Sequence, residues 1–242
     1  MTAEETVARA CPRIGDLGWA FYFAPATLAR GKELGLDGFR FYFLGRGGVL
    51  GDVDAAVAHA AFGYFAPALV ERIWTSARAH VAPVVAAREY FECAAAFGRA
   101  HFGTLDLDAF CAAAGAVNAT ADPVGLTLYS GIRALSLAPD PPARAMQLIA
   151  VLRELRGSAH LLAVRASGLD ARTAHFIRRP DDFASFGWDP DDPPVATDVE
   201  RAKLAAADAL TDALVLPAFA ALDDVARDAL IAGIDAIAAA LS

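Results

Sequence analysis

The sequence contains little of what marks a membrane protein, a secreted protein or a zinc protein. Its three cysteines, Cys11, Cys93 and Cys111, are odd in number and widely spaced, which suits neither a disulfide framework nor a zinc site. The longest run without a charged side chain covers residues 55–70 and is interrupted by Pro67, so it is too short to span a bilayer. The first five residues, Met-Thr-Ala-Glu-Glu, include two acidic side chains and no basic one, unlike a secretory signal. We therefore expect a soluble cytoplasmic protein with no membrane contact.

Positive charge is also scarce, and it is unevenly placed. The chain has 21 Lys and Arg against 29 Asp and Glu, a formal net charge of −8. Residues 133–179 hold 8 basic and 3 acidic side chains, whereas residues 180–242 hold 3 and 13. An acidic chain is a poor candidate for nonspecific nucleic-acid binding, which argues against nucleic acid as a partner without excluding it. The central basic stretch is suited to facing an anion.

Alanine is abundant, with 58 residues, and it is the best helix former. Strand-like alternation is absent, so we predict an all-α bundle of about ten helices with helix-turn-helix-like hairpins. The main predicted helices cover residues 54–64, 67–81, 83–101, 104–114, 126–135, 143–164, 198–217 and 222–241. The pattern Thr197-Asp-Val-Glu200 predicts a capping box at the start of one of them.

We predict two helical halves, residues 1–117 and 118–242, packed as one globular unit. Two stretches resemble each other, since Gly35-Leu-Asp37 and the residues after it parallel Gly168-Leu-Asp170 and its successors. A competing register aligns Tyr42, Arg46 and Leu50 with Tyr129, Arg133 and Leu137. Such matches arise from an ancient duplication or from chance in alanine-rich helices, and both explanations remain open.

The strongest candidate site is the stretch Leu152-Arg-Glu-Leu-Arg-Gly-Ser-Ala-His160. On a helix, an apolar stripe of Leu148, Leu152, Leu155, Ala159 and Leu162 is predicted to be buried. The neighbouring stripe carries Arg153, Arg156 and His160, with Glu154 beside them. Arginine binds carboxylate or phosphate through paired hydrogen bonds, and histidine exchanges a proton near neutral pH. The alternative is a buried ion-pair network between Glu154 and one arginine that only ties helices together.

Gly157 stands in the middle of this predicted helix, where glycine costs roughly 1 kcal/mol relative to alanine. Close approach of another backbone, or of a ligand, would explain it. A second glycine-rich stretch, Gly45-Arg-Gly-Gly-Val-Leu-Gly51, follows an aromatic segment. It could cradle an anion with help from Arg46, but a flexible turn between helices suits it better, because the spacing fits no nucleotide-binding loop.

Residues 162–179 have the pattern of a DNA-binding helix-turn-helix, with a turn at Gly168 and a second helix from Asp170. In that interpretation Arg172, Arg178 and Arg179 would contact phosphate or base edges. The pattern is short, and tightly turned helix pairs are also common in all-α folds in general. His59, His80 and His101 lack paired ligand spacing, and no nucleophile motif is present, so we expect neither a metal nor another cofactor.

These residues resemble an uncharacterised actinobacterial family of all-helical proteins described as helix-turn-helix-like. The resemblance covers most of the chain and rests on Tyr22-Phe-Ala-Pro25, Gly35 to Phe39, the Gly45-Arg46 loop, the Leu152–His160 motif and Gly187-Trp188. The family motif reads Leu-Arg-Glu-His-Arg-Gly-Asp-Gly-His, so Leu155, Ser158 and Ala159 depart from it here, and Val49 replaces a proline. The resemblance implies an all-helical fold and a functional polar cluster, but no reaction.

The sequence favours a protein that binds a small polar or anionic molecule between helices, with acid–base chemistry as an option and enzyme activity undecided. The candidate ligand-binding residues are Arg46, Arg153, Glu154, Arg156, His160, Trp188 and Tyr42. The alternative is a helix-turn-helix transcriptional regulator that uses Arg172, Arg178 and Arg179 on DNA. A homodimer is one option for its assembly.

Overall fold

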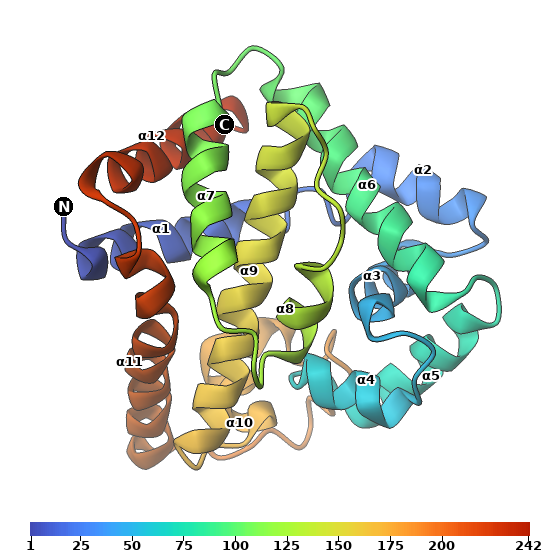
Figure 1. The fold of residues 1–242 in the computed structure, drawn as a ribbon. Helices are drawn as coiled ribbons and strands as arrows, with labels where there is room; N and C mark the ends of the chain where they lie inside the picture. Colours follow the sequence, from blue (N-terminus) through green and yellow to red (C-terminus); the bar gives the residue numbers. More distant parts are fainter.

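The computed structural model describes residues 1–242 and is built of helices only (Figure 1). Twelve α-helices and two short 3-10 helices take the place of the ten predicted helices. The α-helices are α1 (Ala3–Leu17), α2 (Pro25–Glu33), α3 (Gly38–Gly47), α4 (Ala55–Phe62), α5 (Pro67–Arg78), α6 (Pro83–Phe102), α7 (Asp108–Thr120), α8 (Thr127–Ile132), α9 (Pro141–Ala166), α10 (Ala171–Arg178), α11 (Asp198–Ala220) and α12 (Asp224–Ala240). The 3-10 helices are η1 (Gly48–Leu50) and η2 (Pro180–Asp182).

Local sequence explains where many helices begin. Proline occupies the first turn of α2, α5, α6 and α9, where its missing N–H costs nothing. A capping box forms at Thr2 and Glu5, at the start of α1. The capping box predicted at Thr197 is not formed, because the Thr197 hydroxyl bonds the Glu200 carboxylate rather than a free backbone N–H.

Helix α9 passes through the centre of the molecule, beside α7 and across α6 (Figure 1). Leu148, Leu152, Leu155 and Ala159 are buried as predicted, but the Leu162 side chain is 43% exposed. A stripe of side chains that repeats every seven residues drifts slowly around a straight α-helix. At residue 162 the stripe has therefore left the buried face of α9, and Ala163 is buried instead.

One cluster of 52 buried residues runs from Val7 to Ile237 and so draws on both sides of the boundary proposed at residue 117. Helix α7 continues across that boundary to Thr120. No single helix has both the length and the hydropathy to cross a membrane, and only α11 and α12 together, bent by 118°, meet those two criteria.

The two similar stretches adopt the same local structure. Gly35 and Gly168 each end a helix with a positive φ, of 78° and 71°. The following leucine N–H in each case bonds back to a carbonyl five residues earlier, and the aspartate then caps the next helix. The α2–α3 and α9–α10 pairs are therefore joined by the same turn, in which the glycine and the aspartate each have a local role.

The glycine-rich stretch is neither a flexible turn nor an open cradle for most of its length. Gly45 and Gly47 lie inside α3, and Gly48 begins η1. A methyl group on Gly45 would overlap the Tyr90 side chain, and one on Gly48 would overlap the backbone of residue 83. These glycines permit close packing of α3 and η1 against α6, which corrects both interpretations of the stretch.

Candidate functional site

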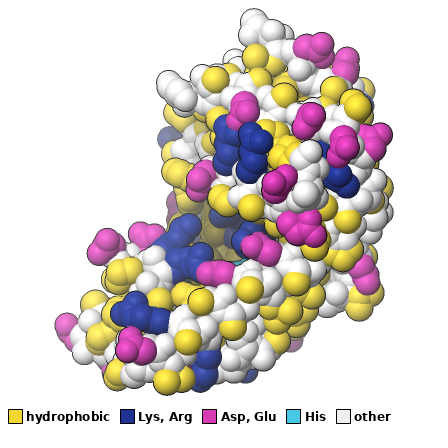
Figure 2. Space-filling view, turned by 90° about the vertical axis from the view of Figure 1, so that its left-hand side faces the viewer, with side chains coloured by type: hydrophobic (Ala, Val, Ile, Leu, Met, Phe, Trp, Pro, Cys, Tyr) yellow, Lys and Arg dark blue, Asp and Glu magenta, His cyan; other side chains and the backbone are white.

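A cleft of about 400 Å³ opens between α1, α3, α9 and α10. Figure 2 shows a hollow in the molecular surface where Lys and Arg side chains gather, with Asp and Glu side chains beside them. The chain segment after α4 and Phe186 complete the wall of the cleft. Of the residues proposed from sequence, Tyr42, Arg46, Arg153, Glu154, Arg156 and His160 all line it.

The floor of the cleft is a buried ion pair between Arg46 on α3 and Glu154 on α9. Arg46 Nε donates to Glu154 Oε1 at 2.9 Å and Nη2 donates to Oε2 at 3.0 Å, so the pair is bidentate. The Arg46 Nη1 group bonds the Tyr42 hydroxyl. Burial alone would lower the pKa of Arg46, but Glu154 and the neighbouring tyrosines hold that pKa well above its ordinary value. Every donor nitrogen of Arg46 therefore has a partner within the protein.

Arg153 and Tyr22 extend this floor toward α1. Arg153 Nε donates to the carbonyl oxygen of Gly15 at 3.2 Å, and Nη1 donates to the Tyr22 hydroxyl at 3.0 Å. The Tyr22 hydroxyl in turn lies 3.3 Å from Glu154 Oε1. Burial raises the pKa of Tyr22 to about 12, so its hydroxyl remains protonated and donates to the carboxylate.

Arg156 and His160 lie one helical turn apart, on the side of the cleft that meets α11. Arg156 Nη2 donates to Asp212 at 2.8 Å, and neither Nε nor Nη1 bonds an oxygen atom of the protein, although the Cys11 thiol lies beside the guanidinium. The Thr211 hydroxyl donates to the Ala207 carbonyl, so it can only accept from His160 Nδ1, 2.9 Å away. His160 thus carries its proton on Nδ1, and Nε2 keeps a free lone pair.

The charge state of His160 is set by its surroundings. Burial, followed by the nearby Arg178 and Arg156, lowers the pKa of His160 to about 4, against the opposite effects of Asp208 and Asp212. The imidazole is therefore neutral at physiological pH, which suits it to accepting a hydrogen bond.

Two buried polar atoms in the wall of the cleft have no hydrogen-bond partner. They are the Tyr64 hydroxyl oxygen and His175 Nε2. The His175 side chain is 5% exposed and stacks on Phe186, with ring centroids 3.9 Å apart. Burial raises the pKa of Tyr64 and lowers that of His175, so both groups are neutral. Unpartnered buried polar groups are rare, because each costs about 1–3 kcal/mol.

Gly157 lines the cleft, next to Arg156 in the chain. A methyl group built on it would meet nothing within 4 Å, and the residue is exposed. Close approach of another backbone therefore does not explain this glycine. The remaining explanation from sequence, a ligand next to it, is compatible with its place in the wall of the cleft.

Trp188 does not line the cleft. Its indole N–H donates to the carbonyl oxygen of Tyr64 at 2.9 Å, so it fixes the chain segment that carries Tyr64. Sequence reasoning missed Tyr64, His175 and Phe186 as cleft residues. No spacing signal connects them, because they come from three segments that only the tertiary fold brings together.

The arginines proposed for DNA binding each face an acidic residue. Arg172 bonds Asp192 at 3.0 Å, and Arg178 bonds Asp208 at 2.6 Å. Arg179 lies 3.9 Å from Asp182. Arg178 also lines the cleft, together with His175 of the same helix α10, and so does Arg179, directly after that helix. No group of three or more His, Cys, Asp or Glu side chains is placed to hold a metal ion.

The profile described as a helix-turn-helix family matches residues 7–191, about three quarters of the chain. The protein belongs to this helix-turn-helix family. The match includes the cleft-lining parts of α1, α3, α9 and α10 and ends before α11, which carries Asp208 and Asp212. No curated protein and no solved structure matches the chain.

Proposed function

We propose that this helix-turn-helix family member binds a small, polar or anionic organic molecule in the cleft between α1, α3, α9 and α10. The observation that carries the proposal is the convergence of Arg156, Arg178 and His160 on one cavity, each with hydrogen-bonding atoms that no protein group uses. A volume of about 400 Å³ lies within the range of ligand pockets.

The charges in the cleft divide into two groups with different roles. Arg46 and Glu154 satisfy each other, so they form the floor and have little left to offer a ligand. Arg156 and Arg178 each give one terminal nitrogen to an aspartate of α11 and keep their remaining N–H donors. Those donors favour a carboxylate or phosphate group. Both Glu154 oxygens are occupied, so any proton transfer in the cleft falls to a histidine, His160 or His175, through its free Nε2.

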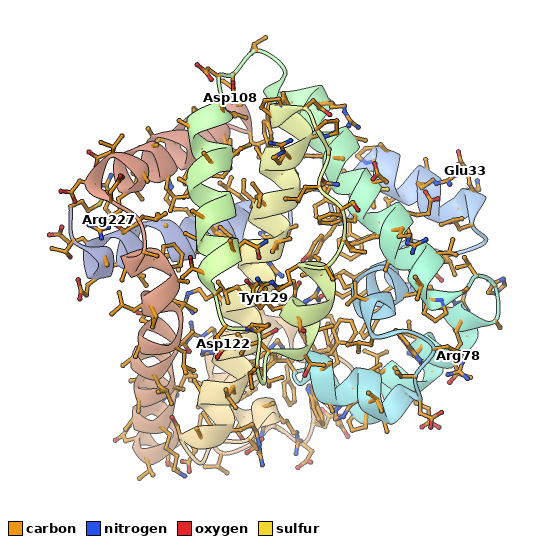
Figure 3. All side chains as sticks on the ribbon, viewed as in Figure 1. Glu33, Arg78, Asp108, Asp122, Tyr129 and Arg227 are labelled. Atoms are coloured by element: carbon orange, nitrogen blue, oxygen red, sulfur yellow. The ribbon has the colours of Figure 1, made fainter.

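A thermal-shift panel of acetate, citrate, inorganic phosphate, cyclohexanecarboxylate and benzoate tests this proposal. We expect at least one anion to raise Tm, since a ligand at 100 times its Kd stabilises the folded state by about 2.7 kcal/mol. The Arg156→Ala variant should lose the shift. Arg78→Ala is the matched control, because Arg78 pairs with Asp52 at the outer end of α5, away from the cleft (Figure 3). A shift that survives in Arg156→Ala would refute the proposal, as would a failure of every small anion, hydroxybenzoates included, to bind.

DNA binding is the second candidate, and the family match favours it over ligand binding. The α9–α10 pair has the tight Gly168 turn of a helix-turn-helix, and Arg172, Arg178 and Arg179 follow on or next to its second helix. The acidic partners of these arginines would have to release them before they could contact phosphate.

Fluorescence anisotropy with duplex DNA at about 50 and 150 mM salt distinguishes this candidate. We expect weak binding that fades as salt increases, because the net charge is −8 and few arginines are unpaired. A nanomolar, sequence-selective complex at the higher salt, lost in Arg172→Ala with Arg178→Ala, would place DNA binding first. The Arg78→Ala variant again serves as the control.

A further inference from the structure

One wall of the cleft is built of stacked rings. Phe186 lies between Phe65, at a centroid distance of 4.1 Å and an angle of 5°, and His175, at 3.9 Å and 28°. Tyr42 and Phe62 continue the aromatic surface toward the floor, where the Arg46 guanidinium lies over both rings, 4.9 Å and 5.1 Å from their centroids. A flat ring presented to such a wall gains both apolar burial and favourable ring geometry.

Polar atoms without partners lie beside this wall. The Tyr64 hydroxyl and His175 Nε2 are buried and unsatisfied, and His160 Nε2 has a free lone pair. The Tyr64 ring lies 6.3 Å from the His160 ring and 6.4 Å from the His175 ring, centroid to centroid. These three side chains therefore form one compact group. The group lies in the same cleft as Arg178 and Arg156, which keep N–H donors that bond no aspartate.

The geometry points to an aromatic carboxylate that also carries a hydroxyl group as the class of molecule bound in this cleft, an inference that rests on the proposed function. The carboxylate accepts from Arg156 and Arg178 N–H groups and from the Tyr64 O–H. The aromatic ring packs against the edge of Phe186, because Phe65 and His175 already cover both faces of that side chain. The ligand hydroxyl donates to the free lone pair of His160, which a carboxylate alone would leave unused. A compact, strongly hydrated anion such as phosphate would leave the aromatic wall uncovered.

Isothermal titration of the full chain with benzoate, its three monohydroxy isomers, cyclohexanecarboxylate and inorganic phosphate tests the inference. We expect at least one hydroxybenzoate to bind tenfold or more tightly than cyclohexanecarboxylate and phosphate. The Tyr64→Phe variant should bind that hydroxybenzoate about tenfold more weakly. Its Tm without ligand should be unchanged or higher, because the deleted hydroxyl has no partner in the free protein.

Tyr129→Phe is the matched control for the loss of a tyrosine hydroxyl. Tyr129 lies on α8, outside the cleft, and its hydroxyl lies 2.9 Å from Asn118 Oδ1 (Figure 3). We expect this variant to lose Tm and keep its affinity for the hydroxybenzoate. Equal affinity for cyclohexanecarboxylate or phosphate, or unchanged affinity in Tyr64→Phe, overturns the inference and leaves the proposed function standing. If no probe of either panel binds, the proposed function falls as well.

Discussion

Replacing Arg46 with alanine is expected to lower the free energy of unfolding by about 3–5 kcal/mol, because the buried Glu154 carboxylate loses its bidentate partner and keeps only the Tyr22 hydroxyl and Arg153, 3.7 Å away. The Glu154 side chain is only 6% exposed, and the two hydrogen bonds from Arg46 satisfy both of its oxygens. In a domain of this size such a loss corresponds to a fall in Tm of roughly 6–20 °C. Urea unfolding followed by circular dichroism measures it directly.

Two further variants show whether the loss of stability comes from the buried Glu154 charge that Arg46 no longer pairs. Arg156→Ala removes an arginine from the same cleft, but its ion pair with Asp212 is partly exposed, with side chains 26% and 48% accessible. We expect it to cost less than about 1 kcal/mol. Replacing Arg46 with Met and Glu154 with Leu together should recover most of the stability lost in Arg46→Ala. Equal losses in Arg46→Ala and Arg156→Ala would contradict the division of the cleft into a structural floor and a binding rim.

This division is what sequence could not provide. Helical periodicity correctly placed Arg153, Arg156 and His160 together, because residues three and four apart share a helix face. The partner of Glu154 lies 108 residues earlier in the chain, on α3, and no local pattern connects them. From sequence, Arg46 is therefore predicted to be free for a ligand. In the fold, all three of its guanidinium nitrogens bond Glu154 or Tyr42.

The helices were easier to predict, since their signals are local. Prolines at the first turn and the aspartate before α10 lie within a few residues of the ends they determine. The segments that local signals predict wrongly are those whose structure depends on tertiary contacts. The Gly45–Gly48 stretch looked like a turn because glycine is rare in helices, yet close packing of α3 and η1 against α6 is what requires it. A glycine in a turn and a glycine at a close contact between helices look the same in the sequence.

Alanine in place of Gly98 or Gly157 should change stability in opposite directions, although both glycines lie within long helices. A methyl group on Gly98 would overlap the carbonyl oxygen of Pro142 and lie 3.0 Å from its carbonyl carbon, where α6 crosses α9. Backbone cannot move aside as a side chain can, so we expect Gly98→Ala to cost about 1–3 kcal/mol or more.

Gly157→Ala meets no atom within 4 Å and removes a helix-breaking residue from α9, so it should stabilise the protein by up to about 1 kcal/mol. The added methyl group enters the wall of the cleft beside Arg156, and we expect it to weaken the binding of any anion that the wild-type protein takes up. Urea unfolding and the benzoate-series titrations measure the two effects separately. A stabilised Gly157→Ala variant that binds as well as the wild type would mean that bound molecules do not reach this part of α9, and a destabilised one would contradict the open space observed there.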